Sequence, residues 1–153
     1  MTTERDASLL HRAALRSGIR EKSVDVLIVE DDDDARTMMA SLLATNGCLV
    51  RGVATSDMAY QSAIERVPDV VVTDLLLRGS SAGWTLAEAL REEPRTRHVA
   101  LIAVTGGVEP RRAVVRPFDA YLRKPVETKL LLALVRQLAM ISRGSRAGTD
   151  VGR

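Results

Sequence analysis

The sequence contains few of the features that mark secreted, membrane or disulfide-rich proteins. Cys48 is the single cysteine among 153 residues, so the chain has no disulfide framework and no cysteine-based metal site. No apolar run approaches the roughly 20 residues of a membrane-spanning helix, and the first residues do not resemble a signal peptide. These absences favour a reducing, cytoplasmic setting.

The composition also lacks a strong charge of one sign. The net charge is +2, which is too small to indicate nucleic-acid binding. The positive charge lies towards the two ends, because residues 1–23 hold five basic against three acidic side chains and residues 142–153 hold three against one. We expect one domain over residues 24–141. A basic extension over residues 1–23, disordered or a short helix, would precede it, and a disordered tail over residues 142–153 would follow it.

The apolar pattern alternates between strands and helices. Apolar runs at residues 24–29, 69–73 and 99–104 have the continuous hydrophobicity of strands that are buried on both faces of a parallel sheet. Weaker strands are predicted at residues 48–54 and 120–123, helices at 33–45, 56–67, 84–92, 109–116 and 127–141, and a loop at 75–83. This order predicts an α/β fold with a parallel sheet and right-handed crossovers.

Polar side chains stand where the predicted strands end: Glu30 and Asp31, then Asp74, then Thr105, then Lys124. Because the carboxyl ends of parallel strands meet at one edge of a sheet, we expect these side chains to lie close together. Two carboxylates about 4 Å apart repel each other by roughly 4 kcal/mol at an effective dielectric constant near 20. Such a cluster therefore needs a positive group beside it.

The chemistry of this group of side chains indicates phosphoryl transfer. Mg²⁺ binds one or two carboxylates and recruits phosphate oxygens, and Glu30 and Asp31 would hold it. The ammonium group of Lys124 and the hydroxyl group of Thr105 can contact the oxygens of a transferring phosphoryl group. Asp74, which stands alone after its strand, is the best-placed nucleophile and would become an aspartyl phosphate.

Four segments in this order resemble the receiver domain of bacterial two-component response regulators: VLIVEDD (26–32), PDVVVTDLLL (68–77), LIAVTG (101–106) and FDAYLRKPV (118–126). The resemblance covers residues 24–141. It implies a doubly wound, flavodoxin-like (βα)5 receiver fold with a five-stranded parallel sheet and five helices. By position, Glu30 and Asp31 match the acidic pair, with Asp31 as the direct metal ligand, and Asp74 matches the phosphoacceptor. Leu76 matches the residue whose backbone carbonyl binds Mg²⁺.

The same resemblance implies a signalling switch. Lys124 matches the lysine that contacts the phosphoryl group, and Thr105 and Tyr121 match the two switch residues. A sensor histidine kinase or a histidine phosphotransfer protein would donate the phosphoryl group to a stand-alone receiver, and an unknown downstream protein would respond. The resemblance thus implies a signalling module rather than a metabolic enzyme, with no direct nucleic-acid binding and no membrane span.

The sequence departs from the family pattern at three places. Arg78-Gly79 stands where Pro-Gly is usual, in a loop with about one extra residue; the stretch from Thr105 to Lys124 is about three residues short; and Pro117 replaces a common glycine. Two alternatives remain open: a receiver-like adaptor that works without phosphorylation, and a metal-dependent phosphohydrolase. The haloacid-dehalogenase type of phosphohydrolase has a second aspartate two residues after the nucleophile, where Leu76 stands here.

Overall fold

The computed structural model describes residues 22–107 and 117–149. Five parallel strands form one sheet in the order β2-β1-β3-β4-β5. The strands are β1 (Asp25–Val29), β2 (Leu49–Val53), β3 (Val70–Asp74), β4 (Ala100–Thr105) and β5 (Ala120–Arg123). Every predicted strand is present with bounds within one residue, and the predicted α/β receiver fold is confirmed.

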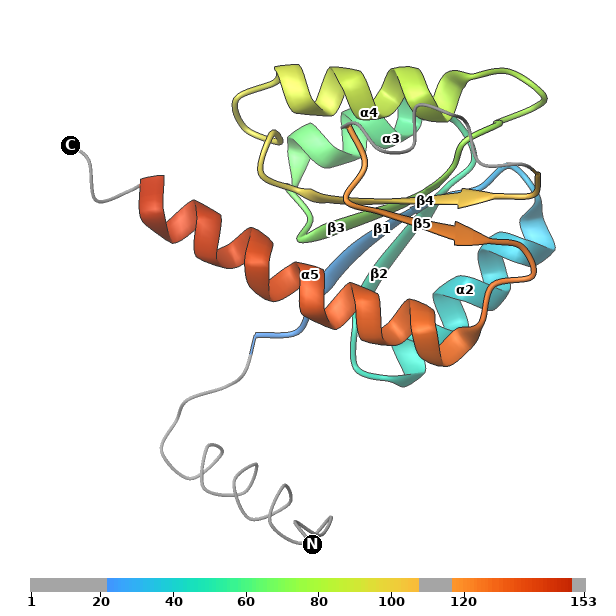
Figure 1. The fold of residues 1–153 in the computed structure, drawn as a ribbon, viewed down its shortest axis with the longest axis horizontal. Coiled ribbons are helices and arrows are strands. Elements are labelled where there is room, and N and C mark those ends of the chain that lie inside the picture. Colours follow the sequence, from blue (N-terminus) through green and yellow to red (C-terminus); the bar gives the residue numbers. More distant parts are fainter. Residues whose placement is uncertain (1–21, 108–116, 150–153) are drawn as a thin grey trace, which may run out of the picture.

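Helices cover both faces of the sheet, so its central strands are buried on both sides. Helices α3 (Ser56–Glu65) and α4 (Ala82–Glu92) lie on one face, and α2 (Asp33–Thr45) and α5 (Thr128–Thr149) lie on the other (Figure 1). Alternate residues of β1 divide between two apolar clusters: Leu27 packs towards α3 and α4, and Ile28 packs towards α2 and α5. This two-sided burial explains why the central strands read as continuous apolar runs in the sequence.

Three predicted helix boundaries need correction, and three predictions lie outside the described residues. Helix α3 ends at Glu65 and not at residue 67. Helix α4 begins at Ala82 and not at residue 84, because residues of the predicted loop already form its first turn. Helix α5 continues to Thr149, so the expected disordered tail is wrong for residues 142–149. The short helix at residues 109–116, the extension over residues 1–21 and the last residues of the tail are not among the described residues.

Tertiary hydrogen bonds explain why α5 continues past residue 141. The Arg143 guanidinium binds both carboxylate oxygens of Asp69 at 3.1 and 2.9 Å and donates to the backbone carbonyl groups of Lys22 and Ser23. Arg146 donates to the carbonyl oxygen of Pro68. These bonds join the last turns of α5 to the amino ends of β1 and β3. A segment whose composition is typical of disorder is therefore held as a helix by the sheet.

The buried ion pair of Asp69 and Arg143 makes stability depend on pH. Burial opposes the ionisation of Asp69, but hydrogen bonds from Arg143 and from the Asp25 N–H, with the charges of Arg143 and Arg146, lower its pKa below 3.8. The ionised form therefore stabilises the fold above the ordinary aspartate pKa, and this contribution is lost as the pH falls through the lowered pKa.

We expect Asp69→Asn to reduce the free energy of unfolding by about 2 kcal/mol near neutral pH, because it removes charge-assisted hydrogen bonds from a buried carboxylate. The difference from wild type should shrink as the pH falls below 3.8. Urea denaturation across this range measures both effects. Asp34→Asn, at an exposed position in α2, is the matched control. A difference that stays constant with pH would show that the carboxylate charge contributes nothing.

None of the helices within residues 22–107 and 117–149 has the length and apolarity that crossing a bilayer requires.

Candidate phosphoryl-transfer site

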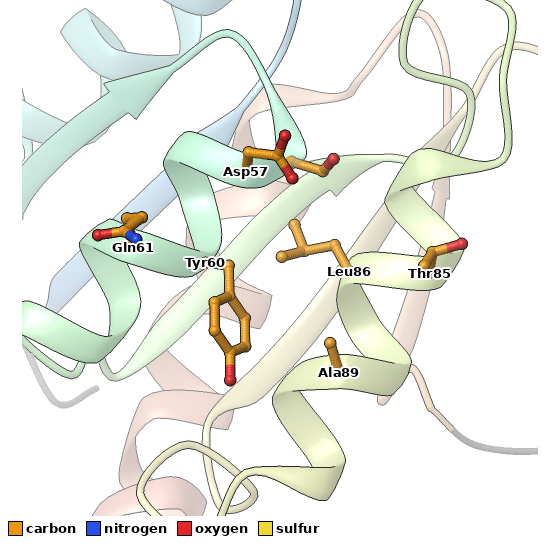
Figure 2. Close-up of a pocket in the computed structure, with 7 residues that line it drawn as sticks. Asp57, Tyr60, Gln61, Thr85, Leu86 and Ala89 are labelled. Carbon is orange, nitrogen blue, oxygen red and sulfur yellow. The ribbon is translucent and has the colours of Figure 1, made fainter.

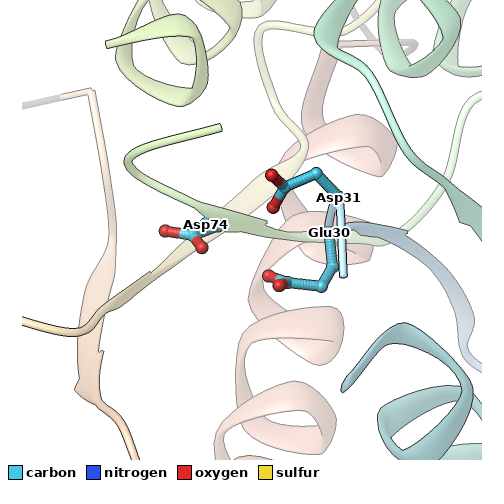
Figure 3. A group of neighbouring side chains, drawn as sticks. All are labelled: Glu30, Asp31 and Asp74. Carbon is cyan, nitrogen blue, oxygen red and sulfur yellow. The ribbon is translucent and has the colours of Figure 1, made fainter. Parts of the chain in front are cut away.

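The parallel register brings the predicted carboxylates to one edge of the sheet. β1 pairs with β3 so that Val29 lies opposite Thr73, and Glu30 and Asp74 therefore follow at the same level. Figure 3 shows Glu30, Asp31 and Asp74 converging at this edge. Each offers an oxygen atom, and these atoms all lie within 4.8 Å of one another. The crowding predicted from the sequence is thus present in the structure.

The ammonium group of Lys124 compensates part of this negative charge. Its Nζ atom donates to Asp74 Oδ2 at 2.9 Å and lies 3.5 Å from Glu30 Oε2. Lys124 follows β5 directly, and its backbone N–H bonds to the carbonyl oxygen of Thr105. Pairing with β4 therefore fixes the backbone of Lys124. The lysine side chain reaches across β4 towards the acids at the ends of β1 and β3.

Burial and charge together shift the pKa values of Glu30 and Lys124. Glu30 is 2% exposed, and burial, with the charges of Asp74 and Asp31, raises its pKa against the opposing effect of Lys124. Burial would lower the pKa of Lys124, but its hydrogen bond to Asp74 and the charges of Asp74 and Glu30 raise it above the ordinary value. Lys124 therefore remains protonated at neutral pH and stabilises the charged form of its partners.

Asp74 is held by its own loop as well as by Lys124. Its Oδ1 atom accepts a hydrogen bond from the Leu76 N–H at 3.1 Å, and the residue is 8% exposed. Leu76 itself is 60% exposed to solvent. Gly83, in the first turn of α4, packs against the backbone of Asp74: a Cβ atom there would lie 1.9 Å from the Asp74 carbonyl oxygen. The start of α4 can approach the end of β3 this closely only because residue 83 has no side chain.

Asp31 lies at the outer side of the cluster. Its Oδ2 atom accepts a hydrogen bond from the backbone N–H of Arg78 at 3.1 Å. Arg78 has φ +52° and Gly79 has φ +72°, and the bridge between Leu77 and Ser80 closes this tight turn. The Arg78-Gly79 departure from the family pattern therefore forms a turn whose backbone contacts one of the predicted metal ligands.

Of the two predicted switch residues, Thr105 ends β4 at the edge of the sheet that carries the carboxylates, whereas Tyr121 lies within β5, opposite Ala103. Thr105 is 6% exposed, and its hydroxyl group accepts from the Gly107 N–H at 3.2 Å and donates to the Gly107 carbonyl oxygen at 3.3 Å. The ring of Tyr121 packs edge-on against Phe118, which in turn packs against Trp84 of α4. Thr105 thus lies at the same sheet edge as Asp74 without contacting its carboxylate in this conformation.

The donor atoms of the cluster fit a small, hard cation. Carboxylate oxygens are the ligands that Mg²⁺ prefers, and the three acids come from two separate strand ends. Glu30 Oε2 is buried, and among the described residues it has an ion pair with Lys124 Nζ at 3.5 Å but no closer hydrogen bond, so it has spare capacity for a cation or for a water molecule bound to one. The backbone carbonyl of Leu76 as a further ligand stays a prediction.

A concave surface lies between α3 and α4, and none of Glu30, Asp31 and Asp74 lines it (Figure 2). It is a shallow groove of about 330 Å³ with Tyr60, Leu86 and Ala89 along it, and Asp57 is its one charged lining residue. This groove lacks the paired acid and base groups that catalysis needs. The cluster at the sheet edge is therefore the better candidate for a functional site.

Sequence reasoning missed two residues that shape the site. The apolar pattern places Gly83 in a loop, although a glycine nine positions after Asp74 could suggest a close approach of chain segments. The pattern gives Arg36 no role, yet its Nη1 atom donates to the carbonyl oxygen of Glu30 at 2.8 Å. The sequence feature that could have indicated this contact is a basic residue close after the acidic first turn of a helix.

Comparison with known proteins decides the family. The sequence profile of the response regulator receiver domain matches residues 26–136. The chain belongs to the response regulator receiver domain family. Receiver domains take part in two-component signalling, in which they accept phosphoryl groups from histidine kinases. The resemblance seen in the sequence is thus confirmed.

Individual relatives agree with this membership. An uncharacterized 14.6 kDa protein in the sodA1 3′ region of Leptolyngbya boryana is 33% identical over 121 residues, which cover 76% of this chain and 91% of that protein. The chain spans only 26% to 54% of seven other curated relatives. These relatives are therefore longer proteins, and their whole activities do not transfer to this receiver domain.

Solved structures share the fold. A putative response regulator from Chloroflexus aurantiacus J-10-fl has a TM-score of 0.71 and 29% identity, covering 78% of this chain and 99% of that one. The receiver domain of the sensor histidine kinase PA1611 from Pseudomonas aeruginosa PAO1 has a TM-score of 0.69 and 23% identity, covering 77% of this chain and 98% of that one. That structure has a magnesium ion coordinated in its active-site cleft.

Proposed function

We propose that this receiver domain accepts a phosphoryl group on Asp74 from a histidine kinase or a histidine phosphotransfer protein and signals through contact with another protein. One observation carries the proposal: the carboxylate of Asp74 lies among two further acids and is hydrogen-bonded to Lys124 at 2.9 Å. An aspartate without a function is normally exposed to solvent and is not buried beside other carboxylates. Membership of the family points to a signalling protein rather than a metabolic enzyme.

The transfer needs little from the protein beyond position and charge. A carboxylate oxygen of Asp74 attacks the phosphorus atom of a phosphohistidine, so that a P–O bond forms while the P–N bond breaks. The bonding electron pair leaves with the imidazole nitrogen of the donor, which takes up a proton. Lys124, already bound to Asp74 Oδ2, is placed to offset the charge on the transferring oxygens.

The three acids are the proposed holders of Mg²⁺, with Asp31 and Asp74 as direct ligands and Glu30 bound directly or through water. The ion would supply positive charge to the oxygens of the phosphoryl group and reduce the repulsion between the carboxylates. The magnesium ion in the cleft of the PA1611 receiver domain supports this assignment.

Phosphorylation would replace the single negative charge of the Asp74 carboxylate with about −1.5 to −2 on the phosphoryl group and would add hydrogen-bond acceptors. The Thr105 hydroxyl group would then exchange its bonds with Gly107 for a bond to the phosphoryl group. Tyr121 lies in the strand that follows and packs against Phe118, so its position would respond to that movement. A surface formed around Tyr121 and α5 is the proposed output region.

The test is phosphorylation with a small donor. After incubation with Mg²⁺ and acetyl phosphate, intact-protein mass spectrometry should detect one added phosphoryl group on the wild type and none on Asp74→Ala. Asp34→Asn, which removes an exposed carboxylate near the site, should be modified like the wild type. Equal modification of the wild type and Asp74→Ala, or no modification of either, would reject the proposal.

Leu76 should lengthen the lifetime of the phosphorylated state. Its exposed apolar side chain stands beside Asp74, where it can keep water from the acyl phosphate. We expect Leu76→Asn to shorten the half-life of the aspartyl phosphate several-fold, because an amide can orient an attacking water molecule. The measurement follows the loss of the phosphoryl group after removal of the donor. Met58→Asn, at an exposed position in α3, is the control and should leave the half-life unchanged. Unchanged decay in Leu76→Asn would contradict this role.

A further inference from the structure

Arg36 ties the start of α2 to the end of β1. Its Nη1 atom donates to the carbonyl oxygen of Glu30 at 2.8 Å, and its Nη2 atom pairs with Asp33. The side chain is 22% exposed, which is low for an arginine that points along the edge of a sheet. The contact spans the segment that carries the acidic pair, because Glu30 and Asp31 lie between β1 and the helix of Arg36.

The surrounding structure fixes the course of the Arg36 side chain. Gly52 of β2 lies beneath its aliphatic part: a Cβ atom at residue 52 would be 3.1 Å from Arg36 Cγ and 3.2 Å from Cδ. Gly52 pairs with Ile28 in the sheet, two residues before Glu30. The stem of Arg36 therefore crosses the edge strand so closely that a side chain at residue 52 would displace it by a few tenths of an ångström.

Both the backbone N–H and the backbone carbonyl group of Glu30 are hydrogen-bonded. Its N–H donates to the carbonyl oxygen of Val53 at 3.1 Å, and its carbonyl oxygen accepts from Arg36. Asp32 then caps α2 by accepting from the Ala35 N–H at 2.8 Å. The peptide unit between Glu30 and Asp31 is thus bound on one side by the guanidinium group and followed at once by a capped helix.

We propose that Arg36, seated on Gly52, is a positioning residue that orients the Glu30–Asp31 peptide and thereby sets the geometry of the metal site. This inference rests on the proposed function, since it concerns the same Mg²⁺ site. Partners that orient metal ligands without touching the metal typically change affinity by about 10- to 100-fold when they are removed.

A role of Arg36 through its charge and a role in positioning the peptide predict opposite changes in Mg²⁺ affinity when the residue is replaced, which makes the inference testable. If Arg36 acted only through its charge, its removal would take a cation away from the acids and tighten Mg²⁺ binding. If Arg36 positions the peptide, its removal lets the two carboxylates separate under their mutual repulsion and weakens Mg²⁺ binding. The sign of the change in the dissociation constant therefore separates the two roles.

The experiment compares Mg²⁺ dissociation constants by isothermal titration calorimetry. We expect Arg36→Gln to raise the constant about 10-fold. Arg36→Lys, which keeps the charge and can reach one carbonyl oxygen, should recover part of that loss. Gly52→Ala keeps the arginine but shifts its stem, so it should raise the constant by a smaller factor.

Arg123→Gln is the matched control, because Arg123 is an exposed arginine at the carboxyl end of β5 beside Lys124. It should leave Mg²⁺ binding unchanged or tighten it slightly. Urea denaturation without Mg²⁺ separates a weakened site from a weakened fold: a loss of affinity in variants that remain fully folded supports positioning.

Two different failures can be told apart. If wild-type protein neither binds Mg²⁺ nor accepts a phosphoryl group from acetyl phosphate, the proposed function itself is wrong. If wild-type protein does both, and Arg36→Gln binds Mg²⁺ as tightly as wild type or more tightly, the positioning role of Arg36 is overturned while the proposed function stands.

Discussion

Replacing Lys124 by alanine is expected to slow the phosphorylation of Asp74 about 100-fold, the usual effect of removing one group that stabilises developing charge in a transition state. Lys124 contacts Asp74 Oδ2 at 2.9 Å and is the cation that the structure places against both Asp74 and Glu30. No other lysine or arginine side chain among the described residues forms an ion pair with either acid. The rate of incorporation from acetyl phosphate, followed by mass spectrometry, measures the effect.

The same substitution should tighten the binding of Mg²⁺, because the ion would no longer compete with an ammonium group for the carboxylates. Slower phosphorylation with tighter metal binding is a combination that partial unfolding cannot produce. Lys129→Ala, at an exposed position in the first turn of α5, should change neither quantity. If Lys124→Ala were phosphorylated at the wild-type rate, the lysine would serve only to hold the unphosphorylated site together.

The second large effect is expected from Gly83→Ala. A Cβ atom at residue 83 would lie 1.9 Å from the Asp74 carbonyl oxygen and 3.0 Å from the Leu75 Cα atom, so backbone atoms would have to move. We expect a loss of about 3 kcal/mol in the free energy of unfolding, at the upper end for an overpacked core. Because the displaced backbone belongs to Asp74, the proposed phosphoacceptor, Mg²⁺ binding and phosphorylation should also weaken in the fraction that remains folded.

Gly144→Ala in α5 provides the matched control. Gly144 lies in a helix like Gly83, but apart from its chain neighbours and the backbone of its own helix no atom stands within 4 Å of the position its Cβ would take. Alanine there should stabilise the protein by up to about 1 kcal/mol, because glycine is a poor residue for a helix interior. Equal stability changes at residues 83 and 144 would show that the contact with Asp74 is not the cause.

The sequence predicted the sheet and the acidic cluster because both depend on local patterns. A strand buried on two faces must be apolar throughout, and in a parallel sheet the residue after such a run lies at a known edge. The bounds of β3 and β4 and the positions of Glu30 and Asp74 follow from these two rules. Lys124 was predictable in the same way, because it follows β5 directly.

The remaining features depend on contacts between distant residues, which local patterns do not contain. Residues 142–149 have small and polar side chains, and their helix is stabilised by bonds from Arg143 to Asp69, 74 positions earlier. Gly83 and Gly52 are needed because another part of the chain passes close to each of them. Such requirements become visible only when the segments have been placed in space.

The bonds from Arg143 to the carbonyl groups of Lys22 and Ser23 also decide how the protein can be handled in experiments. They hold the start of the described chain against the last turns of α5, at the amino edge of the sheet and opposite the acidic cluster (Figure 1). A tether joined upstream of Lys22 would leave the acidic cluster facing away from a sensor chip. Immobilised protein could therefore meet kinases and downstream partners with its reactive edge open.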